Sequence, residues 1–341
     1  MIYVDGLCFI RDNPEDIRDS GLHAFIHDVS AIEMGQNPDG TPWARRTFEK
    51  CLQSIVAMRR RLRGDLAPYA FLATRGSDIE RAIRSGKTAI FLQFQGCEPI
   101  ASDLSRIDLF YELGLRVLQI THHHDNPIGG GALEPRPSGL TRLGFDAIAR
   151  MNELGVIPDL SHASDPTCMD VLATSKKPVI VSHGAARALV NHPRCIPDEA
   201  IRGIADSGGV VGIFMMSFWL TSDPVPRIDH LIAQIRHIIR VGGIDAVGIA
   251  NDYPLRGEPG LAELGNDNAR GVLNYHPWWK SMQERGIWGF ETLPKHVVIP
   301  ELNHVRRMFT IHQALDQAGF KPDEVEKILG GNWVRVLHTL A

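Results

Sequence analysis

Two histidines end two successive apolar runs of the sequence. The segment IPDLSH ends at His162, and PVIVSH ends at His183, 21 residues later. Short apolar runs without polar alternation are typical of strands that are buried on both faces of a parallel sheet. A neutral imidazole is the commonest metal ligand in proteins, so two imidazoles at equivalent strand ends could bind one zinc ion.

Other apolar runs also end in polar side chains. His122 ends VLQITH, Asp252 ends AVGIAND, and Gln95 lies near the end of AIFLQFQG. A single histidine at a strand end is more often a hydrogen-bonded structural residue, and an aspartate before a helix is commonly an N-cap. Four strand ends that carry His122, His162, His183 and Asp252 favour a shared site.

Three histidines are consecutive in the segment THHHDNP. If the strand continues through it, alternation directs His122 and His124 to one face and His123 to the other. At most two of the three could then face one centre, and we expect Asp125 and Asn126 to form a turn.

The elements that position these side chains follow from eight apolar runs. They lie at 2–8, 24–31, 89–96, 117–122, 157–162, 178–183, 210–215 and 246–252, and helix-sized segments such as 137–155 and 164–175 separate most of them. Eight strand–helix units predict an α/β protein with a (β/α)8 TIM barrel, closed by C-terminal helices, in which active sites form at the carboxyl ends of the strands. The alternative, a doubly wound open sheet, normally has a glycine-rich phosphate turn after an early strand, and this sequence lacks that pattern.

The chain is predicted to be a single domain spanning 1–341. The segment around 254–300 is rich in glycine, proline, asparagine and tryptophan, and we expect it to form a long loop inserted at the rim. A further strand-like run at 69–76 is surplus to the eight. Length alone leaves one or two domains open.

Composition narrows the class of protein. The 341 residues are 44% hydrophobic and 22% charged, and the formal net charge of −4 gives no electrostatic footprint for nucleic acid or an anionic membrane. The basic run at 58–64 is expected to end a helix. Five cysteines without a C-x-x-C pair indicate neither a disulfide framework nor a zinc ribbon. The sequence offers no secretory signal and no long apolar span, so a cytoplasmic location is predicted.

The combined motifs resemble the membrane (renal) dipeptidase family of zinc peptidases, a branch of the amidohydrolase superfamily with a (β/α)8 barrel. They are DLSH followed by VSHG, ITH upstream, RCIPD, GIANDY and ILGGNWVRVL. The resemblance implies that His162 and His183 bind one zinc ion and that Asp252 accepts a proton. It also implies that His122 and Arg194 bind the substrate.

Two departures from the family pattern concern the second metal. The family's first strand has D-G-H-x-D, whereas this sequence has DGLCF, with Leu7 and Phe9 at the ligand positions. The family's bridging glutamate is replaced by Gln95 in FQGCE. Two nearby Zn²⁺ ions need carboxylates to offset their repulsion, and these changes remove two carboxylates and one imidazole.

The sequence therefore predicts a site with one metal ion. His162 and His183 would bind it with a third ligand from Gln95, His122 or His124, and one position would stay open for water. Two further residues, Cys97 and Glu98, are possible replacement ligands, although a small apolar packing role is the more common one for such a cysteine.

These observations favour a metal-dependent hydrolase that cleaves an amide or peptide-like bond in a small substrate with a carboxylate. A metal-activated water would attack, and Asp252 would take the proton. Two alternatives remain: a metal-free lyase, hydratase or isomerase that uses the histidines as acid and base, and a catalytically dead ligand-binding relative. The partner is expected to be a small molecule, and a homodimer is possible because many members of the family form dimers.

Overall fold

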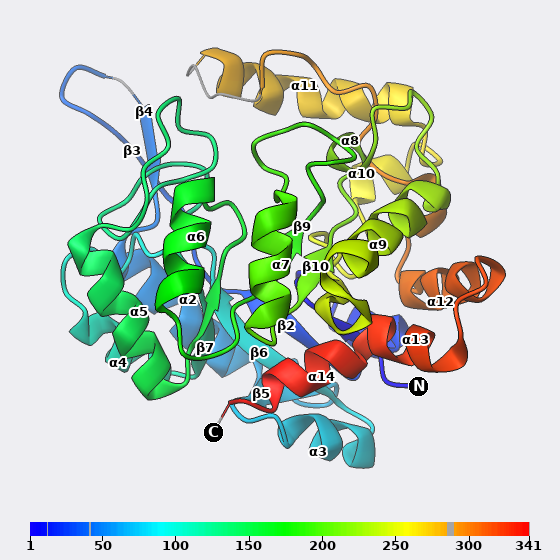
Figure 1. The fold of residues 1–341 in the computed structure, drawn as a ribbon, viewed down its shortest axis with the longest axis horizontal. Coiled ribbons are helices and arrows are strands. Elements are labelled where there is room, and N and C mark those ends of the chain that lie inside the picture. Colours follow the sequence, from blue (N-terminus) through cyan, green and yellow to red (C-terminus); the bar gives the residue numbers. More distant parts are fainter. Residues whose placement is uncertain (12, 41, 285–289, 341) are drawn as a thin grey trace.

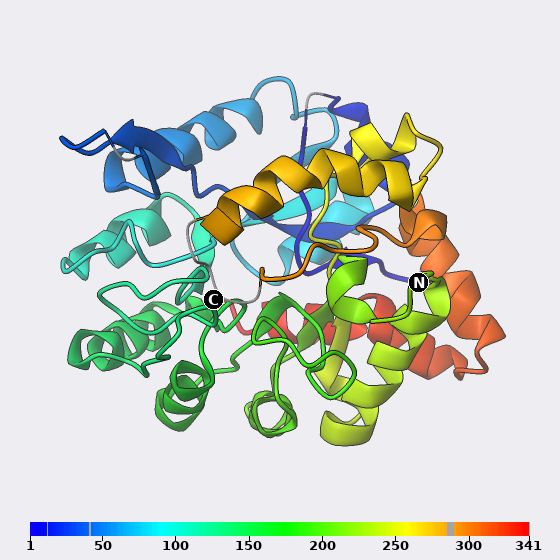
Figure 2. The ribbon, with the colours of Figure 1, turned by 90° about the horizontal axis from the view of Figure 1, so that it is seen from above.

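The computed structural model describes residues 1–11, 13–40, 42–284 and 290–340, and it contains two parallel sheets surrounded by helices (Figures 1 and 2). The first sheet has the order β1 (Val4–Asp5), β2 (Ala24–Asp28), β6 (Thr88–Phe94), β7 (Leu115–Gln119), β8 (Ile157–Asp159). The second has the order β11 (Val247–Ile249), β10 (Val211–Ile213), β9 (Val181–Gly184). A separate antiparallel hairpin joins β3 (Glu33–Gln36) to β4 (Pro42–Arg45).

Backbone hydrogen bonds link the two sheets at both of their outer edges. Between β8 and β9, Leu160 N donates to Ile180 O at 2.8 Å. Between β1 and β11, Gly6 N donates to Ile249 O at 2.9 Å, and Asp252 N donates to Leu7 O at 2.8 Å. The predicted α/β class with parallel strands is confirmed, although the ladders form two sheets rather than one continuous sheet of eight strands.

All eight predicted strands occur, but most are shorter than their apolar runs. The surplus run at 69–76 forms β5 (Ala70–Ala73), which pairs with the first half of β6. The strands β7, β8 and β11 end before His122, His162 and Asp252 respectively. Of these three, His162 and Asp252 have positive φ angles of 65° and 55°, a conformation that cannot continue a β ladder.

Side chains of Thr47, Thr141 and Ser164 cap the first turns of three helices. Helix α6 (Asp165–Thr174) begins as predicted, because the Ser164 hydroxyl accepts a hydrogen bond from Thr167 N. Helix α5 (Arg142–Leu154) begins five residues later than the predicted segment, since Thr141 caps it. The basic run lies at the end of α2 (Phe48–Arg61), as expected. The other helices are α1 (Glu15–Ser20), α3 (Asp78–Ser85), α4 (Ser105–Glu112), α7 (Asp198–Asp206), α8 (Ser217–Leu220), α9 (Ile228–Gly242), α12 (Arg307–Gln317), α13 (Pro322–Glu326) and α14 (Asn332–Leu337).

The segment around 254–300 is not the plain loop that its composition predicted. It contains α10 (Pro259–Ala262) and α11 (Asn268–Glu284), the latter with Pro277 in its interior. Figures 1 and 2 show α11 lying across the top of the molecule, above the strands. In the described part of the chain, no helix combines the length and the apolar character needed to cross a lipid bilayer.

The end of the sheets opposite α11 is filled by the side chain of Trp333 from α14. This ring is fully buried, and its Nε1 donates to Ile249 O at 3.0 Å. Glycines make room for it: a Cβ atom added at Gly6, Gly212 or Gly248 would come within 2.3, 2.9 or 2.4 Å of the ring. A side chain larger than hydrogen at these positions therefore has no space while the tryptophan is present.

We expect Trp333→Ala to lower the free energy of unfolding by about 3–5 kcal/mol, because the surrounding strand backbone cannot move in to fill the cavity that the ring leaves. Urea unfolding followed by circular dichroism measures the change. Trp278→Ala is the matched control, since that ring is 42% exposed and its loss should cost far less. Equal losses in the two variants would contradict the packing role of Trp333.

Candidate active site

A cavity of about 250 Å³ lies where the carboxyl ends of the strands meet helix α11. It brings together four residues predicted from sequence: Gln95, His122, His162 and Asp252. Among the described residues that line it, Asp252 alone carries a carboxylate. One more histidine, His123, also lines the cavity. The remaining wall is aromatic and apolar and consists of Phe9, Met216, Phe218, Trp219, Tyr275 and Trp278.

His162 lines this cavity, whereas His183 does not line it and contacts His162 from the protein interior. Their Nε2 atoms are 2.8 Å apart, and both side chains are buried. The hydrogen bond between the two nitrogens requires one to donate and the other to accept, so at least one Nε2 carries an unprotonated lone pair. The expectation from sequence that these two imidazoles converge on one point agrees with this geometry.

His123 also belongs to this cluster, although the sequence argument directed it away. Its Nδ1 lies 3.1 Å from Nδ1 of His162, and one ring nitrogen each of His122, His123 and His162 lies within 4.8 Å of the others. His124 instead contacts Glu134, with 3.0 Å between Nδ1 and Oε1, and does not line the cavity.

The expected pairing of His122 and His124 on one face is therefore wrong. Strand β7 ends at Gln119, and His123 has a φ of 65°, which folds the chain into a tight turn. The two-residue alternation of a strand does not apply there. The run of three histidines indicated a site in this segment, but their spacing does not predict the turn that places His122 and His123 in the cavity wall.

All four imidazoles of the cluster are held in the neutral state. Burial lowers the pKa of His122, His123, His162 and His183 well below the usual 6.5. The nearby Arg194 guanidinium is the next largest cause for all but His122, where Arg46 takes that place. Neutral rings are what a metal ion requires of histidine ligands.

Asp252 lies beside the imidazole pair, with Oδ2 4.0 Å from His183 Nε2. Burial raises the pKa of its carboxyl group to about 7, and the charge of Arg194 opposes that rise. Its backbone φ of 55° lies in the left-handed region, which non-glycine residues adopt uncommonly. A carboxyl group that titrates near neutrality is suited to accepting and returning a proton.

Arg194 is a buried cation behind the cavity. Its Nη2 donates to His183 O at 3.0 Å, and its guanidinium lies over Phe214 and Trp219 at 5.3 and 5.6 Å. Within the described part of the chain, its Nε and Nη1 have no hydrogen-bond partner. Unpaired buried donors are costly, so an anionic group at this position would be strongly favoured.

The residues that follow β1 and β6 differ from the family's metal-binding pattern, as the sequence indicated. Leu7 is fully buried in the core, and Phe9 lines the cavity. Cys97 is also fully buried, and its Sγ donates to Gln119 O, which excludes it from the cavity wall. Glu98 is not part of the wall either, and the Arg46 cation opposes the rise in its pKa that burial causes.

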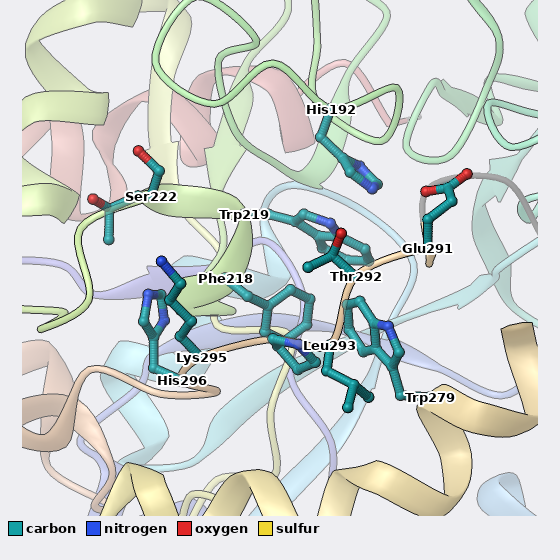
Figure 3. Close-up of a pocket in the computed structure, with 12 residues that line it drawn as sticks. His192, Phe218, Trp219, Ser222, Trp279, Glu291, Thr292, Leu293, Lys295 and His296 are labelled. Carbon is teal, nitrogen blue, oxygen red and sulfur yellow. The ribbon is translucent and has the colours of Figure 1, made fainter.

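A second cavity of about 300 Å³ adjoins the first and shares Phe218 and Trp219 with it. In Figure 3 the rings of Phe218, Trp219 and Trp279 lie close together on one side of it. Polar groups from Lys295 and His192 are among the other lining side chains. The rings of Phe218 and Trp219 thus contribute to the walls of both cavities.

The sequence profile of the membrane dipeptidase family (Peptidase family M19) matches residues 23–268. A dipeptidase of Claviceps purpurea is 29% identical over 272 residues, covering 78% of this chain and 54% of the relative. An uncharacterized dipeptidase of Schizosaccharomyces pombe is 35% identical over 177 residues, covering 50% of this chain and 42% of the relative. The chain therefore spans about half the length of these curated relatives.

Solved structures share the fold over the whole chain. An amidohydrolase from Pseudomonas aeruginosa superimposes with a TM-score of 0.82 at 28% identity, covering 99% of this chain and 96% of that one. A metallopeptidase from Rhodobacter sphaeroides, liganded with a phosphinate mimic of the dipeptide L-Ala-D-Ala, gives a TM-score of 0.74 at 17% identity and covers 100% of this chain and 99% of that one.

Proposed function

This chain belongs to the membrane dipeptidase family, and from that membership we propose that it is a hydrolase that depends on one bound metal ion. The observation that supports this most directly is the contact between two neutral imidazoles, His162 and His183, beside the carboxylate of Asp252, with His162 and Asp252 lining the cavity. Leu7 and Phe9 offer no metal-binding atom where the family has ligands of a second ion, and Gln95 offers no charge. One ion therefore fits the available donors better than two.

The proposal assumes that the eight strands β1, β2, β6, β7, β8, β9, β10 and β11 act as one (β/α)8 barrel. The hydrogen bonds at both sheet edges support this, because they leave no open edge between β8 and β9 or between β11 and β1. The site would then lie at the carboxyl ends of the strands, as in other barrels of this type. It remains a prediction that the chain is a single domain with 254–300 as an insertion at the rim of the barrel. A homodimer is likewise a prediction.

The donor set suits zinc. His162 and His183 would provide two imidazole ligands, and a third would come from His123, His122 or the Gln95 carbonyl oxygen. When bound, the ion would supply Lewis acidity, which polarises a carbonyl group and lowers the pKa of a water molecule.

The remaining groups have separate tasks. Asp252 would accept a proton from the attacking water and return it to the leaving amine. The unpaired Nε and Nη1 of Arg194 lie on different edges of the guanidinium, and one of them would donate a charge-assisted hydrogen bond to a substrate carboxylate. His122, whose ring stacks on His162 with 4.2 Å between centroids, would donate a hydrogen bond to the substrate.

The substrate class follows from these groups and from the wall of the cavity. A small amide or peptide-like molecule with one carboxylate would satisfy Arg194. An apolar side chain would contact the aromatic wall formed by Phe9, Tyr275 and Trp278. The adjoining cavity beyond Phe218 and Trp219 offers room for a further part of the substrate.

Metal analysis together with a dipeptide hydrolysis assay tests the proposal. We expect about one equivalent of zinc per chain after purification and dialysis, with activity lost in chelator and restored by added zinc. Two tightly bound equivalents would contradict the single-ion site. Activity that persists in chelator with less than about a tenth of an equivalent of metal would contradict a metal-dependent hydrolase.

A further inference from the structure

The carboxylate of Asp159 lies beneath the imidazole pair and ties β8 to β9. It is fully buried. Its Oδ1 accepts hydrogen bonds from Ser161 N at 2.9 Å, from Ser161 Oγ at 2.8 Å and from Ser182 N at 2.9 Å. Its Oδ2 accepts one from Ser182 Oγ at 2.5 Å. The Asp and Ser of DLSH and the Ser of VSHG therefore form one cluster.

This cluster reaches the side chain of His183 through Ser182. The Ser182 Oγ lies 2.8 Å from His183 Nδ1. Burial raises the pKa of Asp159, whereas its four hydrogen bonds favour the ionised carboxylate, which can only accept. With Asp159 ionised, Ser182 gives its one hydroxyl proton to that carboxylate, so the Ser182 oxygen accepts the proton on His183 Nδ1. A neutral imidazole has only one N–H group, and therefore Nε2 of His183 is left with a free lone pair.

The same reasoning orders the next two histidines in the metal-free protein. His183 Nε2 accepts from His162 Nε2–H, and His162 Nδ1 then accepts from His123 Nδ1–H. Every donor in this chain of hydrogen bonds points toward Asp159. The series of hydrogen bonds from His123 to Asp159 thus runs in one direction, and the carboxylate of Asp159 determines that direction.

We propose that Asp159 and Ser182 are positioning residues that hold His183 in the Nδ1–H tautomer, with Nε2 free to bind the metal ion. The ligand role of His183 rests on the proposed function, whereas its tautomer rests on these contacts alone. Partners of this kind fix the orientation and the protonated nitrogen of metal-binding histidines, and their loss usually weakens metal binding.

Asp159→Asn provides a sharp test, because it keeps the shape of the side chain and reverses the hydrogen-bond order. Asparagine Oδ1 can still accept the two backbone N–H groups, but its Nδ2 must donate to Ser182 Oγ. The Ser182 proton then goes to His183 Nδ1, which moves the imidazole proton to Nε2. The same exchange at the orienting carboxylate of a Ser–His–Asp triad produces the wrong tautomer.

The tautomer is measured without metal, by imidazole ¹⁵N NMR of the full chain, with the His183 signals assigned by their loss in His183→Asn. We expect Nδ1–H in the wild-type protein and Nε2–H in Asp159→Asn. Zinc affinity, measured by competition with a chelating dye, should fall about 10- to 100-fold in the variant.

Two serine variants separate positioning from simple stability. Ser182→Ala removes the link and should leave His183 as a mixture of tautomers, which also keeps the test valid if Asp159→Asn does not fold. Ser161→Ala is the matched control: its hydroxyl binds the same carboxylate, and its other partners among the described residues are Ser182 Oγ and the backbone N of His183, not the His183 ring. It should keep the Nδ1–H tautomer and the wild-type zinc affinity.

An unchanged His183 tautomer in both Asp159→Asn and Ser182→Ala would overturn the proposal. So would an Nε2–H tautomer in the wild-type protein. If the tautomers shift as expected while the wild-type protein binds no metal, the positioning role stands and the proposed function fails. If the wild-type protein binds one metal ion but the tautomers never shift, only the positioning role fails.

Discussion

Replacing His183 by alanine should remove the bound metal ion and lower kcat/KM by about 1,000-fold or more, because Lewis-acid stabilisation is worth several kcal/mol. The imidazole is fully buried with its Nε2 2.8 Å from His162 Nε2, so alanine would leave the ion one imidazole ligand short beside His162. Metal content of the dialysed variant and steady-state hydrolysis of a dipeptide measure the two effects.

His124→Ala is the control for this substitution. It removes the same side chain from a neighbouring segment, but His124 contacts Glu134 and lies outside the cavity wall. We expect it to keep its metal and to stay within about threefold of wild-type activity, as for most surface substitutions. A His183→Ala variant that retains a full equivalent of metal and most of its activity would refute the ligand assignment.

Which elements form was readable from the sequence, whereas where each strand ends was not. Strands buried between helices and the barrel interior are apolar throughout, so their positions stand out even in a single sequence. The ends depend on backbone conformation, and His162 and Asp252 leave the ladder through positive φ angles that no apolar pattern encodes. The site residues are therefore loop residues at strand ends rather than strand residues, with His183 in β9 the exception.

The sequence placed most of the candidate site but missed two of its determinants. His123 enters the cluster through a turn, and a rule based on strand alternation directs it outward. Helix α11 was expected to be loop because the segment around 254–300 is rich in glycine, proline and asparagine, which lower helix propensity. Tertiary contacts override that preference: Trp279 of α11 is buried, and its Nε1 donates to Phe290 O at 2.9 Å.

The changes at Leu7, Phe9 and Gln95 have a common consequence for the electrostatics of the cavity. They leave Asp252 as the one carboxylate among the described lining residues, while the buried Arg194 supplies a positive charge nearby. The site is thus less negative than one built for two divalent ions. Asp252 and Arg194 offset each other, and a substrate carboxylate would offset part of the charge of a single bound ion.

Asp252→Asn should lower kcat by about 100- to 10,000-fold, the usual contribution of a positioned general base. Asparagine keeps the volume of the side chain and tolerates the positive φ of 55° better than most residues, so the fold and the cavity should be preserved. The amide cannot accept a proton from water, whereas the carboxyl group, with its pKa raised to about 7 by burial, can. KM should change little, because the side chain is not expected to bind the substrate in the ground state.

Metal content decides what a loss of activity in Asp252→Asn means. If the variant keeps its metal and loses kcat, Asp252 acts as the base; if it loses its metal, the carboxylate is a ligand and the proposed division of tasks is wrong. Asp125→Asn is the matched control, since this exposed carboxylate accepts bonds only from Gly131 N and Ser138 Oγ in the described part of the chain. Its kcat should stay within about threefold of wild type, because an amide oxygen can still accept from Gly131 N. A kcat in Asp252→Asn within about tenfold of wild type, with metal retained, would exclude Asp252 as the proton acceptor.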